Sequence, residues 1–152
     1  MGVSLSTDFP LDPSDWSACQ AYGFAVDLFN LGYYWEAHEV WEGLWNQAGR
    51  AGATADFLKG LIKLAAALVK AREGRPLGVE RHGRRAAELF RVIDLAEIAG
   101  CEEGQCAGLS LTKLATMAES LTHNAAELVA AAASRSSPSV RPFDGIVLTP
   151  KR

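Results

Sequence analysis

Apolar side chains recur along most of the chain at intervals of three and four residues, the spacing that places them on one face of an α-helix. Five such segments are expected, over residues 13–31, 33–47, 55–73, 77–99 and 111–133. No alternation of period two runs long enough to build a sheet. The pattern therefore predicts an all-α fold, a mainly antiparallel bundle of four to five helices.

Capping residues mark the ends of these segments. Asp12, Thr54 and Ser110 stand where the first, third and fifth helices would need an N-cap. Glycines follow the first four segments and favour a left-handed stop at each. The connection between the first two helices is very short, which predicts an antiparallel hairpin.

The composition divides the chain into three parts. We expect an N-terminal arm over residues 1–12, the helical bundle over 13–133, and a C-terminal linker and tail over 134–152. Residues 134–141 are rich in Ser, Pro and Arg, whereas residues 143–148 are apolar again. A short strap docked on the bundle and a disordered end both remain open for this tail.

The totals favour a soluble cytoplasmic protein. A length of 152 residues fits one domain, and the formal net charge is −3. Three cysteines, an odd number, suggest no disulfide framework and favour a reducing compartment. The first residues lack the features of a signal peptide, and no apolar run is long enough to cross a membrane. No membrane partner is therefore expected.

Residues 29–45 hold the densest set of large and ionisable side chains, with three Trp, two Tyr, one His and three Glu. On a helical wheel, Trp41 and Tyr34 lie at the centre of the apolar arc. His38 falls inside this arc, and Glu42 lies at its edge, one turn further on. His38 and Glu42 are therefore close enough to form a hydrogen bond.

Asn30 ends the first predicted helix on the side that faces this arc. We therefore expect Asn30, His38 and Glu42 to form one hydrogen-bonded cluster. The full candidate pocket is Asn30, Tyr34, Glu36, His38, Glu39, Trp41, Glu42 and Trp45. Two interpretations stay open: His38 is a core histidine held by its neighbours, or it lines a functional pocket between helices.

A catalytic reading of this segment rests on His38 as a base or metal ligand, with Glu39 and Glu42. The string from His38 to Glu42 resembles the H-E-x-x-H zinc motif, but its fifth position is Glu. A metal would need a third ligand, and His82 is the only other histidine on an apolar stripe. We expect no metal site; His38, Glu42 and His82 are the weak candidates, and the cofactor is unknown.

The segment as a whole resembles the signature of the domain of unknown function 309 family. The string F-N-x-G-x-Y-x-E-A-H-E-x-W-E-x-x-W is met from Phe29 to Trp45, and F-x-x-G-L-I-x-L-A is met from Phe57 to Ala65. The resemblance covers about residues 13–95 and departs at Lys63, where the family often has Gln, and at Lys70, where His is common. It implies a small all-helical prokaryotic protein and carries no established activity.

The charges are unevenly spread. Residues 1–50 hold seven acidic and one basic residue, whereas residues 59–91 hold nine basic and three acidic ones. Glu36 and Glu39 lie away from the apolar arc, so we expect one of them to pair with this basic segment, within the chain or across a homo-oligomer. The candidate anion-binding residues are Arg81, Arg84, Arg85 and Arg91.

Three functions follow from these patterns. The first is a small binding or scaffold module with a polar pocket at the hairpin of the first two helices, whose partner is an unidentified small molecule or protein. The second is an enzyme that uses His38 with Glu39 and Glu42, as in a metal-dependent hydrolase. The third is an anion- or nucleic-acid-binding adaptor that uses residues 59–91. Nucleic acid is not the expected partner, because the total charge is acidic and no aromatic side chains are interleaved with the bases.

Overall fold

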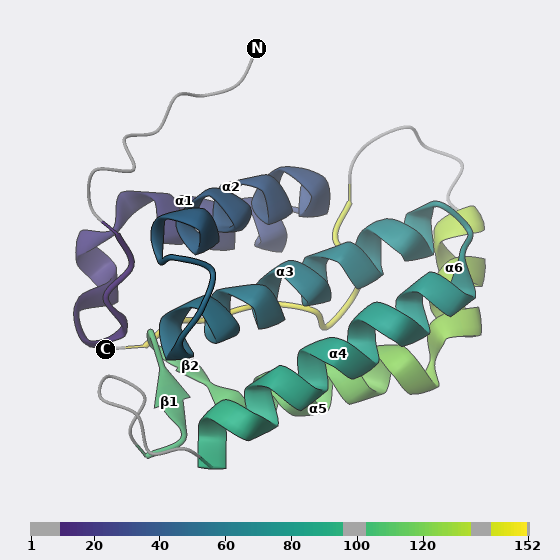
Figure 1. The fold of residues 1–152 in the computed structure, drawn as a ribbon. Helices are drawn as coiled ribbons and strands as arrows, with labels where there is room; N and C mark the ends of the chain where they lie inside the picture. Colours follow the sequence, from purple (N-terminus) through teal and green to yellow (C-terminus); the bar gives the residue numbers. More distant parts are fainter. Residues whose placement is uncertain (1–9, 96–102, 135–140, 152) are drawn as a thin grey trace.

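The computed structural model describes residues 10–95, 103–134 and 141–151 and shows a bundle of α-helices (Figure 1). The prediction of an all-α fold is confirmed. A 3₁₀ helix, η1, comes first, and one two-stranded hairpin precedes α5. The elements are η1 (Pro13–Ala18), α1 (Gln20–Asn30), α2 (Tyr34–Gln47), α3 (Ala53–Arg72), α4 (Pro76–Leu95), β1 (Gln105–Cys106), β2 (Leu109–Ser110), α5 (Leu111–His123) and α6 (Ala125–Ala133).

Helix α3 lies at the centre of the bundle. It packs against α2 on one side and against α4 on the other, and its middle is buried almost throughout. Helix α1 packs on α2, and α5 packs on α4. Helix α6 contacts both α3 and α4. The core therefore lies around α3, and the α1–α2 hairpin forms one edge of the molecule.

Most of the predicted N-caps are observed in the structure. Asp12 caps η1 through its carboxylate, and the Ser110 hydroxyl accepts a hydrogen bond from the N–H of Lys113, as expected. Thr54 is not a cap, because α3 begins at Ala53 and its N-cap is Gly52, whose φ is +98°. The end of the fourth predicted helix, residues 96–99, lies outside the described residues.

Two predicted helices are each divided in two. The segment 13–31 breaks at Cys19, whose backbone is extended, and residues before it form a 3₁₀ helix. The segment 111–133 breaks at Asn124, which ends α5 and begins α6. Both breaks fall within continuous apolar stripes, so periodicity alone does not reveal them.

The hairpin of β1 and β2 pairs Gln105 with Ser110 and Cys106 with Leu109. Tyr22 of α1 anchors its turn, since the buried hydroxyl donates to the carbonyl oxygen of Ala107 at 2.8 Å. Cys106 is disulfide-bonded, which the odd cysteine count and the expectation of no disulfide framework did not indicate. Cys19 is a free, buried thiol.

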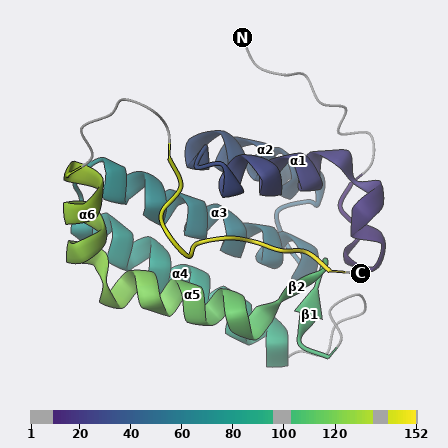
Figure 2. The same cartoon turned by 180° about the vertical axis from the view of Figure 1, so that it is seen from behind.

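The C-terminal segment 141–151 is docked on the bundle. It crosses α3 between the α1–α2 hairpin and α5, and its end reaches the β1–β2 hairpin (Figure 2). Its path is extended except for one turn, where the N–H of Ile146 donates to the carbonyl oxygen of Phe143. Of the two alternatives for the tail, the docked strap is the one observed for these residues.

Candidate functional site

The signature segment forms the end of α1, the connection to α2 and most of α2. Its apolar arc is buried as the wheel predicts: Tyr34, Ala37 and Trp41 are fully covered, and Trp45 is half-buried. Phe29 packs against both Tyr34 and Trp41, with ring centroids 5.1 and 5.8 Å apart. The aromatic residues of this segment therefore build the α1–α2 hairpin itself.

The predicted contact between His38 and Glu42 is confirmed. The Nε2 atom of His38 lies 3.3 Å from a carboxylate oxygen of Glu42, and Glu42 is about half exposed. The imidazole lies beside the exposed ring of Trp35, with centroids 5.1 Å apart. Its Nδ1 atom is buried and has no hydrogen-bond partner among the described residues, and the same holds for Nε1 of Trp41.

Asn30 does not join this pair. Its side-chain nitrogen donates to the carbonyl oxygen of Leu148 at 2.7 Å, and its side-chain oxygen accepts from the N–H of Leu148 at 2.8 Å. The predicted cluster is therefore wrong in its Asn30 member. The reason is that the tail brings a paired donor and acceptor to the end of α1, which matches both atoms of one amide.

Tyr34, four residues after Asn30, binds an earlier part of the same tail. Its hydroxyl accepts a hydrogen bond from the N–H of Phe143 at 2.9 Å. The two rings stack, with centroids 6.0 Å apart and planes inclined by 13°. Phe143, Ile146 and Leu148 are buried in the strap. Tyr34 thus contributes a polar contact to the tail backbone and an apolar contact to its first anchoring side chain.

Arg72, at the end of α3, joins the hairpin to the tail. Its guanidinium lies over the Tyr34 ring, 4.5 Å from the centroid. It donates to the carbonyl oxygen of Gly32 and, at 2.6 Å, to that of Arg141. The planar, five-donor guanidinium suits this double role, because it can stack and bind carbonyls at once.

Gly32 lets the tail approach the hairpin closely. Its φ of +92° is a left-handed conformation, as the sequence predicts for the end of the first helix. A Cβ atom at this position would lie 2.7 Å from the backbone of Arg141 and of Pro142. The glycine therefore serves two purposes, a turn and a contact between two backbones.

The surface formed by Asn30, Gly32, Tyr34 and Arg72 is called the tail groove below. Sequence reasoning placed Asn30 and Tyr34 in a pocket but assigned neither to the tail, and it missed Arg72. The apolar stretch 143–148 was the available signal, and its length and composition do not reveal where it docks. Chemically, the groove binds backbone N–H and C=O groups and holds an aromatic side chain.

The acidic residues Glu36 and Glu39 are exposed. No ion pair joins either of them to residues 59–91 within the described part of the chain. The arginines of α4 are distributed over different surroundings. Arg85 pairs with Glu88 on its own helix, and Arg91 pairs with Glu119 of α5.

The residues considered for a metal do not form a ligand set. No group of three or more His, Cys, Asp or Glu side chains in the described ranges is placed to hold a metal ion. His82 is half-buried on α4, and burial and the nearby cations Lys63 and Lys70 lower its pKa. A third ligand beside His38 and Glu42 is therefore not supplied by the described residues.

Comparison with known proteins agrees with the sequence pattern. Residues 22–82 match the family described as Domain of unknown function (DUF309), the family that the signature segment resembles. No curated protein and no solved structure matches the chain. The matched range contains all four residues of the tail groove, whereas the tail lies outside it.

Of the helices that the structure describes, none is long and apolar enough to cross a membrane.

Proposed function

We propose that this protein is a binding module whose tail groove receives an extended polypeptide segment, and that residues 141–151 occupy the groove in cis. The observation that carries the proposal is the paired hydrogen bonding between the Asn30 amide and the backbone of Leu148. A side-chain amide that binds both backbone groups of one residue recognises an extended chain in the way that a neighbouring β-strand would. Such binding does not depend on the side chain of the residue bound.

The groove also has features that select a sequence. Phe143 stacks on Tyr34, and Ile146 and Leu148 are buried further along. The ligand that fits is therefore a segment with an aromatic residue, a turn, and aliphatic residues three and five positions after the aromatic one. Burial of each such side chain contributes about 1.5–3 kcal/mol, and backbone hydrogen bonds add to this.

The extent of the family match supports treating the tail groove and the tail as separate parts, a binding site and its ligand. The groove residues lie within the family range 22–82, and the tail lies outside it. A tail bound in cis acts as a competitor, because its tether gives it an effective concentration in the millimolar range. A partner segment would then bind only when its affinity, or a change in the tail, overcomes this competition. We expect this to take place in the cytoplasm, the compartment that the cysteine count and the N-terminal residues favour, and in a prokaryote, as the family resemblance implies.

A peptide-binding assay tests the proposal. A fluorescein-labelled peptide of residues 141–151 is titrated with the wild type and with the full-length double variant Phe143→Ala/Leu148→Ala, and anisotropy is recorded. The double variant should bind the peptide more tightly, because its own tail competes less. Adding Asn30→Ala should weaken that binding about tenfold or more, the effect of losing one to two hydrogen bonds. Absence of binding to the double variant, with its helical fold intact by circular dichroism, would show that the groove accepts only a covalently attached strap.

A further inference from the structure

A second surface, separate from the tail groove, gathers positive charge. It is a shallow hollow of about 590 Å³ where α3 ends and α4 begins. Four basic or titratable side chains line it, and Pro76, Leu77 and Gly78 complete the lining. The four are Lys70, Arg75, Arg81 and His82.

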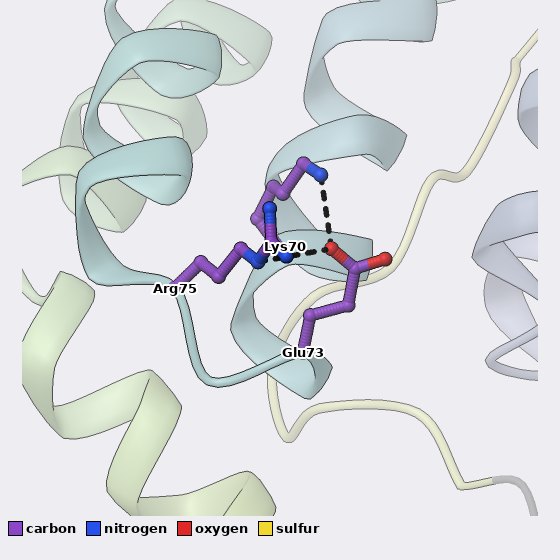
Figure 3. A network of polar contacts seen from close by, with 3 residues as sticks. All are labelled: Lys70, Glu73 and Arg75. Atoms are coloured by element: carbon purple, nitrogen blue, oxygen red, sulfur yellow. Dashed lines mark hydrogen bonds and ion pairs between the residues drawn. The ribbon is translucent and has the colours of Figure 1, made fainter.

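Glu73, which contacts two of these side chains, neutralises only part of their charge. A carboxylate oxygen of Glu73 lies 2.9 Å from Nζ of Lys70 and 3.9 Å from Nε of Arg75 (Figure 3). One carboxylate therefore serves two cations. Within the described part of the chain, no ion pair neutralises Arg81. Lys70, Arg75 and Arg81 against Glu73 leave an excess of two positive charges, in a chain of net charge −3.

The surroundings of His82 are also rich in basic groups. Burial comes first among the causes that lower its pKa, and the charges of Lys63 and Lys70 from α3 and of His38 from α2 follow. The pKa of Lys63 is also lowered, first by burial and then by the charges of Lys59 and Arg85. Basic groups from three helices, α2, α3 and α4, therefore lie near one another around His82.

Gly78 fixes one of these groups. A Cβ atom on Gly78 would lie 2.7 Å from Cγ and 2.9 Å from Cδ of Lys70. The stem of Lys70 therefore lies directly across the first turn of α4. This packing holds the Lys70 ammonium group at the rim of the hollow rather than leaving it free in solvent.

We propose that this hollow binds a phosphate-type anion, carried by a small molecule, through Lys70, Arg75, Arg81 and His82. Lysine and arginine donors form charge-assisted hydrogen bonds to phosphate oxygens, and arginine can bind two oxygens at once. The ligand reduces the repulsion among the basic groups. The site differs from the arginine face expected from the sequence, since Arg85 and Arg91 are already paired with acids.

Calorimetric titration with sodium pyrophosphate, at constant ionic strength set by sodium chloride, tests this site. The wild type should bind one pyrophosphate, and Arg81→Gln or His82→Gln should weaken binding about tenfold, the effect of one lost charge-assisted contact. Gly78→Ala should also weaken it, because the new methyl group displaces Lys70. The matched control is Arg84→Gln on the same helix, in a different hollow beside Arg91 and Glu119, and it should leave the affinity unchanged.

Nuclear magnetic resonance locates the bound anion independently. Pyrophosphate should shift the imidazole resonances of His82, whereas those of His123, on α5, should not move. Equal loss of affinity in Arg84→Gln and Arg81→Gln would overturn the proposal, because it would indicate general screening by an anion. So would binding of a short DNA duplex together with no measurable binding of pyrophosphate, since that would assign the basic surface to nucleic acid.

Discussion

The side-chain amide of Asn30 binds both backbone groups of Leu148, a residue 118 positions further along the chain. Asn30 is the last residue of α1, and Gly32 and Tyr34, which also contact the tail, follow directly. One connection between two helices therefore supplies three contacts to the strap. Arg72 closes the same site from α3.

Replacing Asn30 by alanine should loosen the end of the tail. The N–H and C=O of Leu148 would lose their partners, and a partly buried, unpaired backbone group costs about 1–3 kcal/mol. We expect urea denaturation to show a loss in that range and hydrogen exchange at the Leu148 amide to accelerate. Asn46→Ala is the matched control, since Asn46 is exposed and its side-chain oxygen accepts a hydrogen bond from Arg50, just beyond the end of α2; it should change stability by less than about 0.5 kcal/mol. Equal effects of the two changes would contradict the assigned role.

Local interactions in this molecule could be predicted from the sequence. The helices, the caps at Asp12 and Ser110 and the contact between His38 and Glu42 each depend on residues within one or two helical turns. Periodicity and spacing describe such contacts directly. The burial of Tyr34 and Trp41 followed for the same reason.

Contacts with the tail could not be predicted in this way. The strap has no helical or strand period, and its bonds to Asn30 and Tyr34 join residues more than 100 positions apart. From the sequence alone, an Asn at a helix end is equally consistent with a helix cap, a hydrogen-bond partner in the core or a residue that binds a ligand. Arg72 sits among other basic residues, and only the packing of α3 against the hairpin distinguishes it from Arg75.

Gly32→Ala should lower the unfolding free energy by more than backbone strain at a positive φ alone would. An alanine at φ +92° is strained, and its Cβ would also collide with the backbone of Arg141 and Pro142. Gly49→Ala is a close control: its φ is +84°, and nothing lies within 4 Å of the added atom. Gly49→Ala should cost about 1–2 kcal/mol of unfolding free energy, and Gly32→Ala clearly more. Identical losses would mean that the close approach of the tail contributes nothing.

Arg72→Lys keeps the charge but removes the planar group. Lysine cannot stack on Tyr34 while binding the carbonyl oxygens of Gly32 and Arg141. We expect a loss of about 1 kcal/mol in unfolding free energy and faster exchange of the Phe143 amide. The same change at exposed Arg75, whose guanidinium forms an ion pair with Glu73 at 3.9 Å, should have little effect. Unchanged Phe143 exchange in Arg72→Lys would argue against the stacking role.

His82 should make stability depend on pH. Burial and the nearby Lys63 and Lys70 lower its folded-state pKa below the ordinary value of 6.5. Between these two values the unfolded chain binds more protons than the folded one, so acid favours unfolding. The contribution is fully present above about pH 6.5 and is lost as the pH falls towards the folded-state pKa. In urea titrations between pH 7.5 and 5, His82→Gln should lose less stability than the wild type; parallel curves for the two proteins would exclude this role.

The central claim is that the tail groove is a binding site and that the tail is its exchangeable ligand. A protease site introduced within residues 135–140 of the full chain would convert the tail into a separate peptide after cleavage. The most direct measurement is then the exchange of that peptide for an excess of a labelled 141–151 peptide, followed by anisotropy. The account predicts reversible replacement in the folded protein, with labelled peptide retained less well when Asn30 is alanine. A cleaved protein that unfolds on losing its tail, or one that never takes up the labelled peptide, would contradict it.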